Sequence, residues 1–299
     1  MAKKQIGGTL LVLLAGILWG TMGLFVRSLS VGYGLSSMQI VFARLLEGAV
    51  LYWIVIGLFR RADARISGRD FLWAAAMGIF SLLLFAFCYF QAITRINLSV
   101  AAVLLYTSPI WIMLMSALFF KEPLTLQKIL VLLLAFAGCV LVSGLSGESV
   151  SLSGVVFGLL SGIGYGAYSI FGTVLLRRNR SLTVTAYAFT VAAVGAAFLC
   201  EPGAMLHTVA VHSGDFALWM TLLLMGVVTA FIPYLAYTKG LEMVGATRAS
   251  ILATVEPMMA TLLGVLVYHE RLSLWSALGI GCILTAIILK STIREKEKP

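Results

Sequence analysis

Long hydrophobic runs alternate with short polar segments from one end of the chain to the other. Most runs are close to the length of about 20 apolar residues that crosses a hydrocarbon core about 30 Å thick. Apolar residues are continuous within each run, whereas the strands of a membrane barrel would alternate apolar and polar positions. The pattern therefore predicts an all-α membrane protein with ten transmembrane helices, called spans 1 to 10, at residues 7–27, 36–58, 71–92, 98–119, 127–145, 153–176, 182–200, 216–238, 246–267 and 273–290.

The composition agrees with a lipid environment. Of the 299 residues, 61% are hydrophobic and only 11% are charged, and the mean hydropathy is +1.04. A water-soluble chain needs more polar side chains than this to cover its outer surface. The four cysteines are interpreted as small packing residues rather than metal ligands, because they lie in or at the end of hydrophobic runs: Cys88, Cys139, Cys200 and Cys282.

Basic residues are concentrated in the short loops and tails. The net charge is +9, but these residues form no face with interleaved aromatics, so a nucleic-acid partner is not expected. If the N-terminus is cytoplasmic, 17 of the 21 lysines and arginines fall on the inward side. Arg27, Arg95 and Arg271 fall on the outward side, and Arg44 lies inside span 2. Because positive residues favour the cytoplasmic side, both termini are predicted to be cytoplasmic.

The N-terminal segment and the loops add no further domain. The basic start and apolar run resemble a signal peptide, but the run continues to Phe25 and Val26, so we expect it to remain as span 1. The longest predicted loops are 60–70 on the inward side and 201–215 on the outward side. Neither leaves room for a soluble domain.

The sequence is repeated. Residues 107–125, TSPIWIMLMSALFFKEPLT, align without a gap with residues 255–273, VEPMMATLLGVLVYHERLS, so that Pro109 falls on Pro257 and Glu122 on Glu270. Earlier in the chain, Trp19 aligns with Tyr165 in the same way. Spans 1 to 5 therefore repeat as spans 6 to 10, which divides the chain into two halves at residues 1–147 and 148–299.

The repeated unit has an odd number of helices, so its second copy enters the membrane from the opposite side. Such inverted repeats are typical of secondary transporters, in which the two halves exchange conformations around a site near the bilayer midplane. The repeat thus predicts alternating access. Duplication retained only for packing is the alternative.

At this point the chain resembles the EamA-type branch of the drug/metabolite transporter superfamily. The resemblance rests on ten short-looped helices in two halves, on the LFFKEPLT and GVLVYHERLS stretches that close spans 4 and 9, and on Trp19 and Gly20 of span 1. It implies a cavity walled by spans 1 to 4 and 6 to 9, with spans 5 and 10 peripheral. It also implies transport of amino acids, amines, nucleotides, sugars or drugs, without indicating which.

Two charged residues lie inside span 2. Arg44 is about 12 Å into the membrane, counted from Ser36 at about 1.5 Å per residue, and Glu47 follows three residues later on nearly the same helix face. One interpretation is an ion pair that fastens span 2 to the bundle. The other is that Arg44 faces the cavity and binds an anionic group such as a carboxylate. In the family that the chain resembles, an arginine at this place is common and Glu47 is less expected.

A third charged residue, Glu256, precedes Pro257 inside span 9. Proline removes a backbone donor and kinks the helix, so kinks are predicted at Pro109, Pro233 and Pro257. Glu256 is a candidate to bind an amine or to carry a proton, and Glu47 is a second candidate for proton coupling. The alternative for Glu256 is a packing role with a lysine or hydroxyl partner.

Aromatic residues near the kinks are candidate substrate contacts, although most aromatics in membrane helices pack or lie at the interface. Trp19 and Tyr165 occupy equivalent positions in the two halves and are flanked by glycines that permit close helix approach. With Glu256 they would form a box for a cation. The predicted substrate-binding residues are Trp19, Arg44, Tyr106, Tyr165, Tyr168, Tyr237 and Glu256.

The sequence-based hypothesis is a secondary active transporter of a bacterial inner or plasma membrane, not an enzyme. We expect it to export a small polar metabolite, an amino acid or amine, either with protons as the coupling ion or without coupling. An importer or facilitator of an organic cation such as a quaternary amine is the alternative. No catalytic signature is present, and no cofactor or metal is expected. The expected partners are a small-molecule substrate and the lipid bilayer, with the protein as monomer or homodimer.

Overall fold

The computed structural model describes residues 2–96, 98–143, 151–269 and 273–292. Glu270 and Arg271, which the sequence places at the end of span 9, lie outside the described residues. The described part of the chain is helical throughout, with short connections. The first matching half contains α1 (Ala2–Gly20), α2 (Met22–Tyr33), α3 (Ser37–Phe59), a 3₁₀ turn (Arg61–Ala64), α4 (Gly68–Gly78), a π-helical segment (Ile79–Leu84), α5 (Phe85–Ile93), α6 (Leu98–Leu105), α7 (Ser108–Phe120) and α8 (Leu126–Ser143).

The second half has a similar order of elements. It contains α9 (Leu152–Leu175), α10 (Ser181–Ala197), α11 (Pro202–Val211), α12 (Phe216–Met225), a π-helical segment (Gly226–Phe231), α13 (Ile232–Val244), α14 (Ala246–Ala253), α15 (Val255–Tyr268) and α16 (Leu274–Thr292). The chain is therefore all-helical within the described ranges, as the continuous apolar runs predict.

Several helical stretches are long and apolar enough to cross a membrane, which makes this a multi-pass membrane protein. Within the described ranges there are 8 of them, or up to 9 if a bent pair counts as one span. The bent pair is α10 with α11, which meet at 92°, and α16 contributes only the shorter apolar segment Leu274–Leu289. The count of ten spans stays a prediction.

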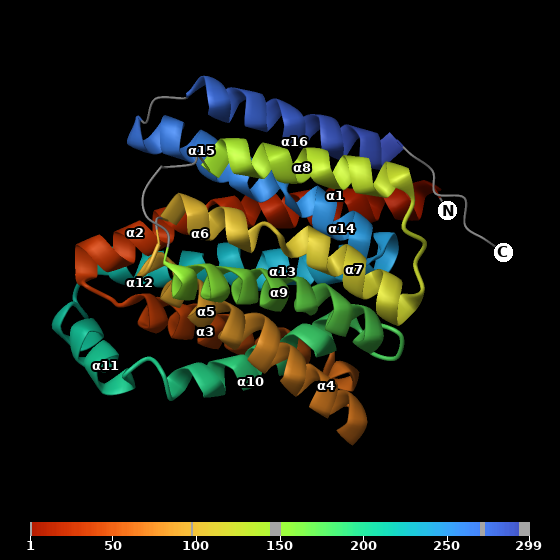
Figure 1. Ribbon diagram of the computed structural model, residues 1–299. Coiled ribbons are helices and arrows are strands. Elements are labelled where there is room, and N and C mark those ends of the chain that lie inside the picture. The colour runs from red at the N-terminus through yellow and green to blue at the C-terminus, as the bar shows by residue number, and fades with distance from the viewer. Residues whose placement is uncertain (1, 97, 144–150, 270–272, 293–299) are drawn as a thin grey trace.

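The helices lie roughly side by side, and those of the first half interleave with those of the second (Figure 1). α1 packs against α13, α14 and α15, whereas α9 packs against α5, α6 and α7. α3 packs against α10 and the π-helical segment Gly226–Phe231. α8 and α16 pack against each other along one side of the bundle, far from α3 and α10 (Figure 1).

Two membrane helices are interrupted just before a proline. α6 ends at Leu105 and α7 begins at Ser108, immediately before Pro109. α14 ends at Ala253 and α15 begins at Val255, two residues before Pro257. Because proline has no N–H to donate to the preceding turn, each break falls where the helix ladder loses a bond.

Other local features recur at the same spacing. The π-helical segments Ile79–Leu84 and Gly226–Phe231 interrupt the third helix of each half, and Pro233 follows the second of them directly. Lys121 and His269 both end their helices with φ of 55°, in the left-handed region. The two halves therefore share π-helical segments and left-handed helix ends at corresponding positions, as well as similar sequences.

Glycines allow the first helix of each half to touch a backbone carbonyl of the other half. A Cβ atom built on Gly20 of α1 would lie 2.9 Å from the carbonyl oxygen of Glu256. A Cβ atom on Gly166 of α9 would lie 3.1 Å from the carbonyl oxygen of Ser108. Both contacts lie beside a proline break, so the glycines bring α1 and α9 against the interrupted helices.

The connection at 201–215 differs from the loop that the sequence analysis predicted. Residues Pro202–Val211 form α11, none of whose residues is buried. Pro202 is well suited to the first turn of a helix because its missing N–H would have no partner there. Glu201, at φ 51°, makes the sharp bend after α10. The clustering of proline, glycine and histidine favoured a loop, but the local cap and the short apolar run are enough to form a helix.

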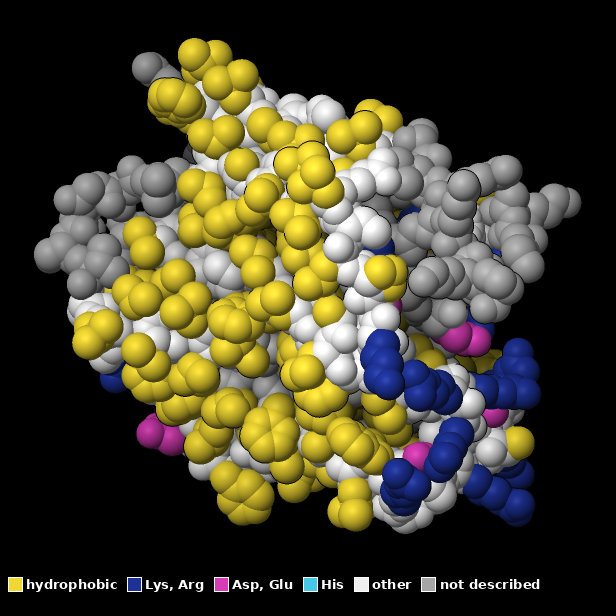
Figure 2. Space-filling model, turned by 45° about the vertical axis from the view of Figure 1, so that its right-hand side comes forward, with side chains coloured by type: hydrophobic (Ala, Val, Ile, Leu, Met, Phe, Trp, Pro, Cys, Tyr) yellow, Lys and Arg dark blue, Asp and Glu magenta, His cyan; other side chains and the backbone are white. Residues whose placement is uncertain are grey.

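The outer surface agrees with a membrane environment. Large hydrophobic side chains such as Leu10, Val194 and Leu266 are 61%, 58% and 70% exposed. Figure 2 shows hydrophobic side chains over most of the visible face, while Lys and Arg side chains gather toward one end. This distribution fits a lipid-facing belt with a basic region at one membrane surface.

Candidate functional site

A small cavity lies among α1, α9, α13 and the π-helical segment Ile79–Leu84. Its lining is Trp19, Ser81, Tyr165, Tyr168, Tyr234 and Tyr237. The cavity measures about 10 Å³, which is close to the smallest volume that holds one water molecule. Four of the predicted substrate contacts thus meet at one place, and the space between them is small.

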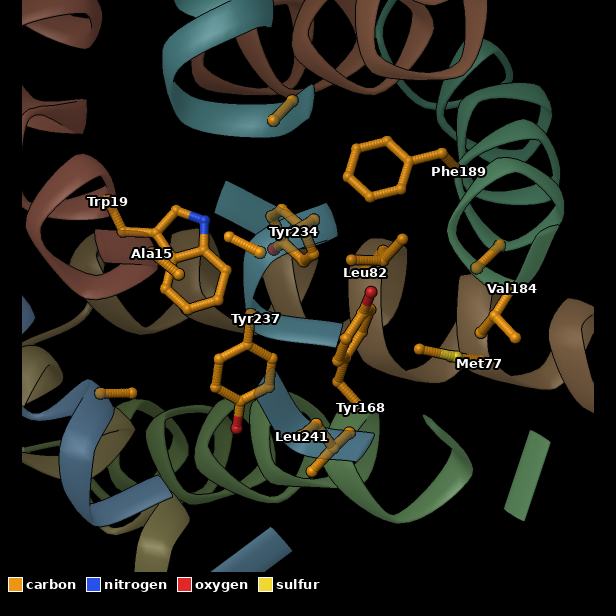
Figure 3. Packing of buried hydrophobic residues seen from close by; sticks show 14 of the residues in the cluster. Ala15, Trp19, Met77, Leu82, Tyr168, Val184, Phe189, Tyr234, Tyr237 and Leu241 are labelled. Carbon is orange, nitrogen blue, oxygen red and sulfur yellow. The ribbon is translucent and has the colours of Figure 1, made fainter. Parts of the chain in front are cut away.

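The aromatic rings of the lining form one connected cluster, and Figure 3 shows how Trp19, Tyr168, Tyr234 and Tyr237 pack in it. Tyr234 is at its centre, with its ring centroid 4.9 Å from that of Trp19, 5.2 Å from that of Tyr168 and 4.9 Å from that of Phe189. Trp19 also contacts Tyr237 at 5.2 Å. Most of these contacts are edge-to-face, the geometry that aromatic quadrupoles prefer. The cluster joins helices of both halves.

Trp19 and Tyr165, the pair predicted from equivalent positions, are brought together. Their ring centroids are 6.3 Å apart in an edge-to-face arrangement. The Tyr165 hydroxyl donates a hydrogen bond of 2.9 Å to Oε2 of Glu256. Glu256 lies in the first turn of α15, where the helix dipole favours a negative charge. Tyr165 of the cavity lining therefore holds the Glu256 carboxyl group against that lining.

Arg44 reaches the same cluster from α3. Its Nη2 donates to the Thr229 carbonyl at 3.1 Å and approaches the Tyr234 hydroxyl at 3.5 Å. The guanidinium carbon also lies 5.5 Å from the centroid of the Tyr234 ring. Thr229 belongs to the π-helical segment Gly226–Phe231, whose wider hydrogen-bond spacing changes where its carbonyls point. Arg44 and Glu256 thus contact the aromatic cluster through different tyrosines.

Glu47 lies against the same π-helical segment as Arg44 but has no hydrogen-bond partner for its Oε2 among the described residues. Among the ion pairs of the described residues, none joins the two side chains, so the arrangement gives no support to the ion-pair interpretation. Instead the Glu47 carboxyl lies against Gly226, where a Cβ atom would be 2.5 Å from Oε2. This Oε2 atom is buried without a hydrogen-bond partner in the described structure. Glu47 therefore packs between α3 and the π-helical segment, outside the cavity lining.

The remaining predicted residues lie at or near the helix breaks. Tyr106 is half-buried at the α6–α7 break and packs against the main hydrophobic core. It does not line the cavity. Pro109 and Pro233 are the second residues of α7 and α13, and Pro257 is the third residue of α15.

Two cavity residues were not found by the sequence analysis, namely Tyr234 and Ser81. Tyr234 directly follows Pro233, which was the available signal, but the chain has 10 tyrosines and no pattern separates this one. Ser81 lies in an apolar stretch with no neighbouring charge. Its Oγ and the Trp19 Nε1 are buried without hydrogen-bond partners among the described residues. Buried polar atoms are normally paired, so these two are free to bind a polar ligand group.

The other tyrosines of the lining have their hydroxyls engaged. Tyr168 bonds Thr238 at 2.8 Å, and Tyr237 bonds Ser169 at 2.7 Å. Both bonds join α9 to α13. Tyr168 and Tyr237 therefore offer ring faces to the cavity, while the polar contacts come from Trp19, Ser81 and the two charged residues.

The apolar helices define an integral membrane protein, and the aromatic cavity inside the helix bundle is its candidate ligand site. Comparison with known families makes the class specific. The EamA-like transporter family matches residues 6–144 and again residues 152–292, and the chain belongs to this family. It is thus a membrane transporter, which agrees with the resemblance found in the sequence.

Individual relatives agree with this assignment. The chain is 27% identical over 282 residues to an uncharacterized transporter of Archaeoglobus fulgidus, covering 94% of this chain and 95% of the relative. It is 26% identical to the uncharacterized inner membrane transporter YicL of Salmonella typhimurium, covering 95% of each chain. One crystal structure has the same fold, with a TM-score of 0.74 at 20% identity over 94% of this chain and 95% of that one.

Proposed function

We propose that this transporter moves a small zwitterionic metabolite, such as an amino acid, by alternating access. The observation that carries the proposal is that one cationic and one anionic side chain each contact a tyrosine that lines a single aromatic cavity. Arg44 contacts the cluster at Tyr234, and Glu256 contacts it at Tyr165. Arg44 suits a carboxylate, because its planar fork matches carboxylate geometry. Glu256 and the ring faces suit an ammonium group.

The unpartnered polar atoms support a ligand that is small and polar. Trp19 Nε1 donates, and Ser81 Oγ both donates and accepts. A carboxylate or backbone-like carbonyl would satisfy the indole N–H. The cavity of about 10 Å³ is too small for an amino acid, so binding requires the surrounding helices to move apart.

Alternating access would come from the two halves, at residues 1–147 and 148–299, acting as an inverted repeat of five helices each, with ten spans in all. The recurrence of proline breaks, π-helical segments and left-handed helix ends supports this arrangement. So does the reciprocal packing of α1 on α13–α15 and of α9 on α5–α7. Rocking at the glycine contacts of Gly20 and Gly166 would open the cavity to either side.

We further propose export from the cytoplasm coupled to protons. Glu256 supports coupling because it is the acid that accepts a hydrogen bond from Tyr165 of the cavity lining, so its protonation and its contact with an ammonium group would compete. Glu47 is the second candidate carrier, since its Oε2 is buried and unpartnered among the described residues. Moving a charge through lipid is costly, so buried acids of this kind are typical of proton relays.

The second candidate function is uptake or facilitated passage of an organic cation such as a quaternary amine. It is favoured by one specific observation, the aromatic box around Trp19 beside Glu256. Such a ligand would use the ring faces and Glu256 and would not need Arg44. The two functions therefore differ in whether Arg44 matters.

A series of ligands that differ in charge distinguishes the amino-acid function from the organic-cation function. The purified protein is mixed with each common amino acid, with its methyl ester, which is a cation, and with its N-acetyl derivative, which is an anion. A ligand that binds only the folded state raises the melting temperature. We expect the wild type to bind the zwitterion most tightly. Glu256→Gln should lower the affinity for the zwitterion and the ester, which carry an ammonium group, about ten- to a hundredfold. Arg44→Lys should lower the affinity for the zwitterion and the N-acetyl derivative, which carry a carboxylate, by as much.

The control is Arg27→Gln, which removes an arginine that lies 4.1 Å from the Tyr268 ring, away from the cavity lining. It should leave all three responses as in the wild type. Binding of the ester alone, unaffected by Arg44→Lys, would replace the proposal with the organic-cation function. Wild-type responses from both Arg44→Lys and Glu256→Gln would show that the site lies elsewhere.

A further inference from the structure

A cluster of arginines lies at one end of the bundle, away from the proposed transport site. Residues 60–70 and 177–180 contain seven arginines and only two acids, Asp63 and Asp70. The arginine cluster is Arg60, Arg61, Arg65, Arg69, Arg177, Arg178 and Arg180, and all seven are exposed. Figure 2 shows Lys and Arg side chains gathered in this way at one end of the molecule.

Polar contacts hold the two segments of the cluster together. Arg180 pairs with Asp63 at 3.3 Å, and the Thr183 hydroxyl donates to the Asp63 carbonyl at 2.9 Å. Asn179 donates to Asp70 at 3.1 Å. Both acids of the two segments are therefore engaged, and the cluster keeps an excess of positive charge.

Four of these arginines have no partner of their own. Arg60, Arg65, Arg69 and Arg178 make no ion pair or side-chain hydrogen bond with the part of the chain that the structure describes. An exposed guanidinium is a planar, bidentate donor that matches a phosphate group. The cluster is thus complementary to an anion that carries a phosphate.

An apolar groove of about 590 Å³ lies between α3 and α10, the helices whose ends carry Arg60 and Arg180. Its walls run from Phe42 to Ile54 on α3 and from Thr190 to Ala197 on α10. At about 1.5 Å per residue the α3 wall is about 18 Å long, close to the thickness of one leaflet of a hydrocarbon core about 30 Å thick. Ile54 is about 9 Å from Arg60 along the helix by the same rise.

The groove has no free polar group. Its two polar side chains satisfy each other, because the Trp53 indole N–H donates to the Thr190 hydroxyl at 2.8 Å. Trp53 also contacts Tyr187, whose hydroxyl donates to the Ala64 carbonyl at 2.8 Å. Ala64 is in the same turn as Asp63. The Trp53 and Tyr187 contacts thus connect the groove to the turn Arg61–Ala64, which carries part of the arginine cluster.

We infer that the arginine cluster and the α3–α10 groove form a binding site for one anionic phospholipid of the surrounding membrane. The phosphodiester headgroup binds the unpartnered arginines, and an acyl chain enters the groove at Trp53 and Ile54. Charge complementarity identifies the occupant, since an apolar groove alone would fit any lipid tail, whereas the cluster selects a negative headgroup. The site binds α3, which carries Arg44 and Glu47, to the membrane.

The test compares phosphatidylglycerol with phosphatidylcholine of the same acyl chains, added to the detergent-purified protein and followed by native mass spectrometry. We expect tighter binding of phosphatidylglycerol. Arg60→Gln with Arg65→Gln should weaken it about 10- to 30-fold, at roughly fivefold per arginine. Arg27→Gln with Arg95→Gln changes the charge equally at other sites and should leave the preference intact.

The groove is tested separately with Val194→Trp, which fills the lining at a position 58% exposed. We expect weaker phosphatidylglycerol binding than with Val156→Trp, a control on α9 that is 48% exposed outside the groove. Equal binding of the two lipids, or equal losses in the two arginine pairs, would overturn the proposal. So would inorganic phosphate at the same concentration displacing phosphatidylglycerol completely, because the site would then bind a soluble anion.

Discussion

At the scale of single residues, the site depends on side chains that connect charge to aromatic packing. Tyr234 contacts Trp19, Tyr168 and Phe189 through its ring and Arg44 through its hydroxyl. Its ring is 5% exposed, so most of its surface is buried. The ring and the hydroxyl therefore have separable roles, one in packing and one in orienting Arg44.

Tyr234→Phe is expected to lower affinity for anionic probes about fivefold, because a hydrogen bond of ordinary strength is lost while the ring stays in place. The melting temperature should hardly change. Tyr234→Ala should instead lower the free energy of unfolding by about 3–5 kcal/mol, since it leaves a cavity in the core. Binding curves and thermal unfolding in detergent separate the two effects.

The matched control for the hydroxyl is Tyr187→Phe, which removes a hydrogen bond to the Ala64 carbonyl away from the cavity lining. It should leave anion binding unchanged. If it reduced anion binding as much as Tyr234→Phe, the loss would reflect general destabilisation and the role assigned to Tyr234 would be wrong.

At the scale of elements, two helices can pack closely where a glycine faces a neighbouring helix and leaves no room for a Cβ atom. A Cβ atom on Gly20 would lie 2.6 Å from the Met259 Cβ and 2.9 Å from the Glu256 carbonyl oxygen. A Cβ atom on Gly57 would meet nothing within 4 Å. The same substitution thus has opposite consequences on α1 and on α3.

Gly20→Ala is expected to reduce the free energy of unfolding by about 1–3 kcal/mol, because α1 must move away from α15. Gly57→Ala should be neutral or stabilise by up to about 1 kcal/mol, from its better helix propensity. Thermal unfolding of both variants in the same detergent is the measurement. Equal stability of the two would mean that α1 and α15 do not pack as closely as described.

The connection between α2 and α12 gives a pH-dependent prediction. Asp215 accepts hydrogen bonds of 2.8 Å from the Tyr33 hydroxyl and 2.8 Å from the Ala217 N–H. The Tyr33 bond, followed by the backbone bonds at the start of α12, lowers the pKa of Asp215 below its ordinary value. Its stabilising effect is therefore fully present above the ordinary carboxyl pKa of about 4 and is lost as the pH falls through the lowered value.

Asp215→Asn keeps an acceptor and a good helix cap but cannot titrate. Between about pH 7 and about pH 3, its melting temperature should fall less than that of the wild type. Glu201→Gln, which changes the charge equally at another exposed acid, should follow the wild type. An identical acid profile for wild type and Asp215→Asn would contradict the role given to this carboxylate.

At the scale of the whole molecule, the basic end and the hydrophobic outer surface indicate how the helix bundle is oriented across the membrane. The turn at 60–70 and the α10–α12 connection lie at opposite ends of the bundle (Figure 1). The excess of arginine around the first of them leads us to expect that this end faces the cytoplasm. The outward end would then carry α11.

Cysteine labelling checks this orientation. In a variant with the four native cysteines replaced by serine, Gly214→Cys should react with a membrane-impermeant maleimide in intact cells. Ala62→Cys should react only after permeabilisation. Both positions are exposed. The reverse pattern would invert the orientation, and labelling of both in intact cells would contradict a membrane-spanning arrangement between them.

The sequence by itself determined the environment, the helical class and the family. Continuous apolar runs admit only helices in lipid, because each segment must satisfy its own backbone, and the repeat was visible as matched letters at a fixed spacing. The sequence also indicated Arg44, Glu256, Trp19 and Tyr165, because charges within apolar runs and paired aromatics are conspicuous. These signals depend only on neighbouring residues in the chain, so they can be recognised from the sequence alone.

Only the tertiary structure decided which of these residues meet. It placed Arg44 on Tyr234 and Glu256 on Tyr165, gave no ion pair between Glu47 and Arg44 among the described residues, and left Tyr106 outside the cavity lining. It also brought in Tyr234 and Ser81, which no sequence pattern distinguished. The reason is that contacts between helices depend on rotation and crossing, which π-helical segments and glycine contacts set. Neighbouring residues in space come from segments far apart in the chain, and their pairing is not encoded in local periodicity.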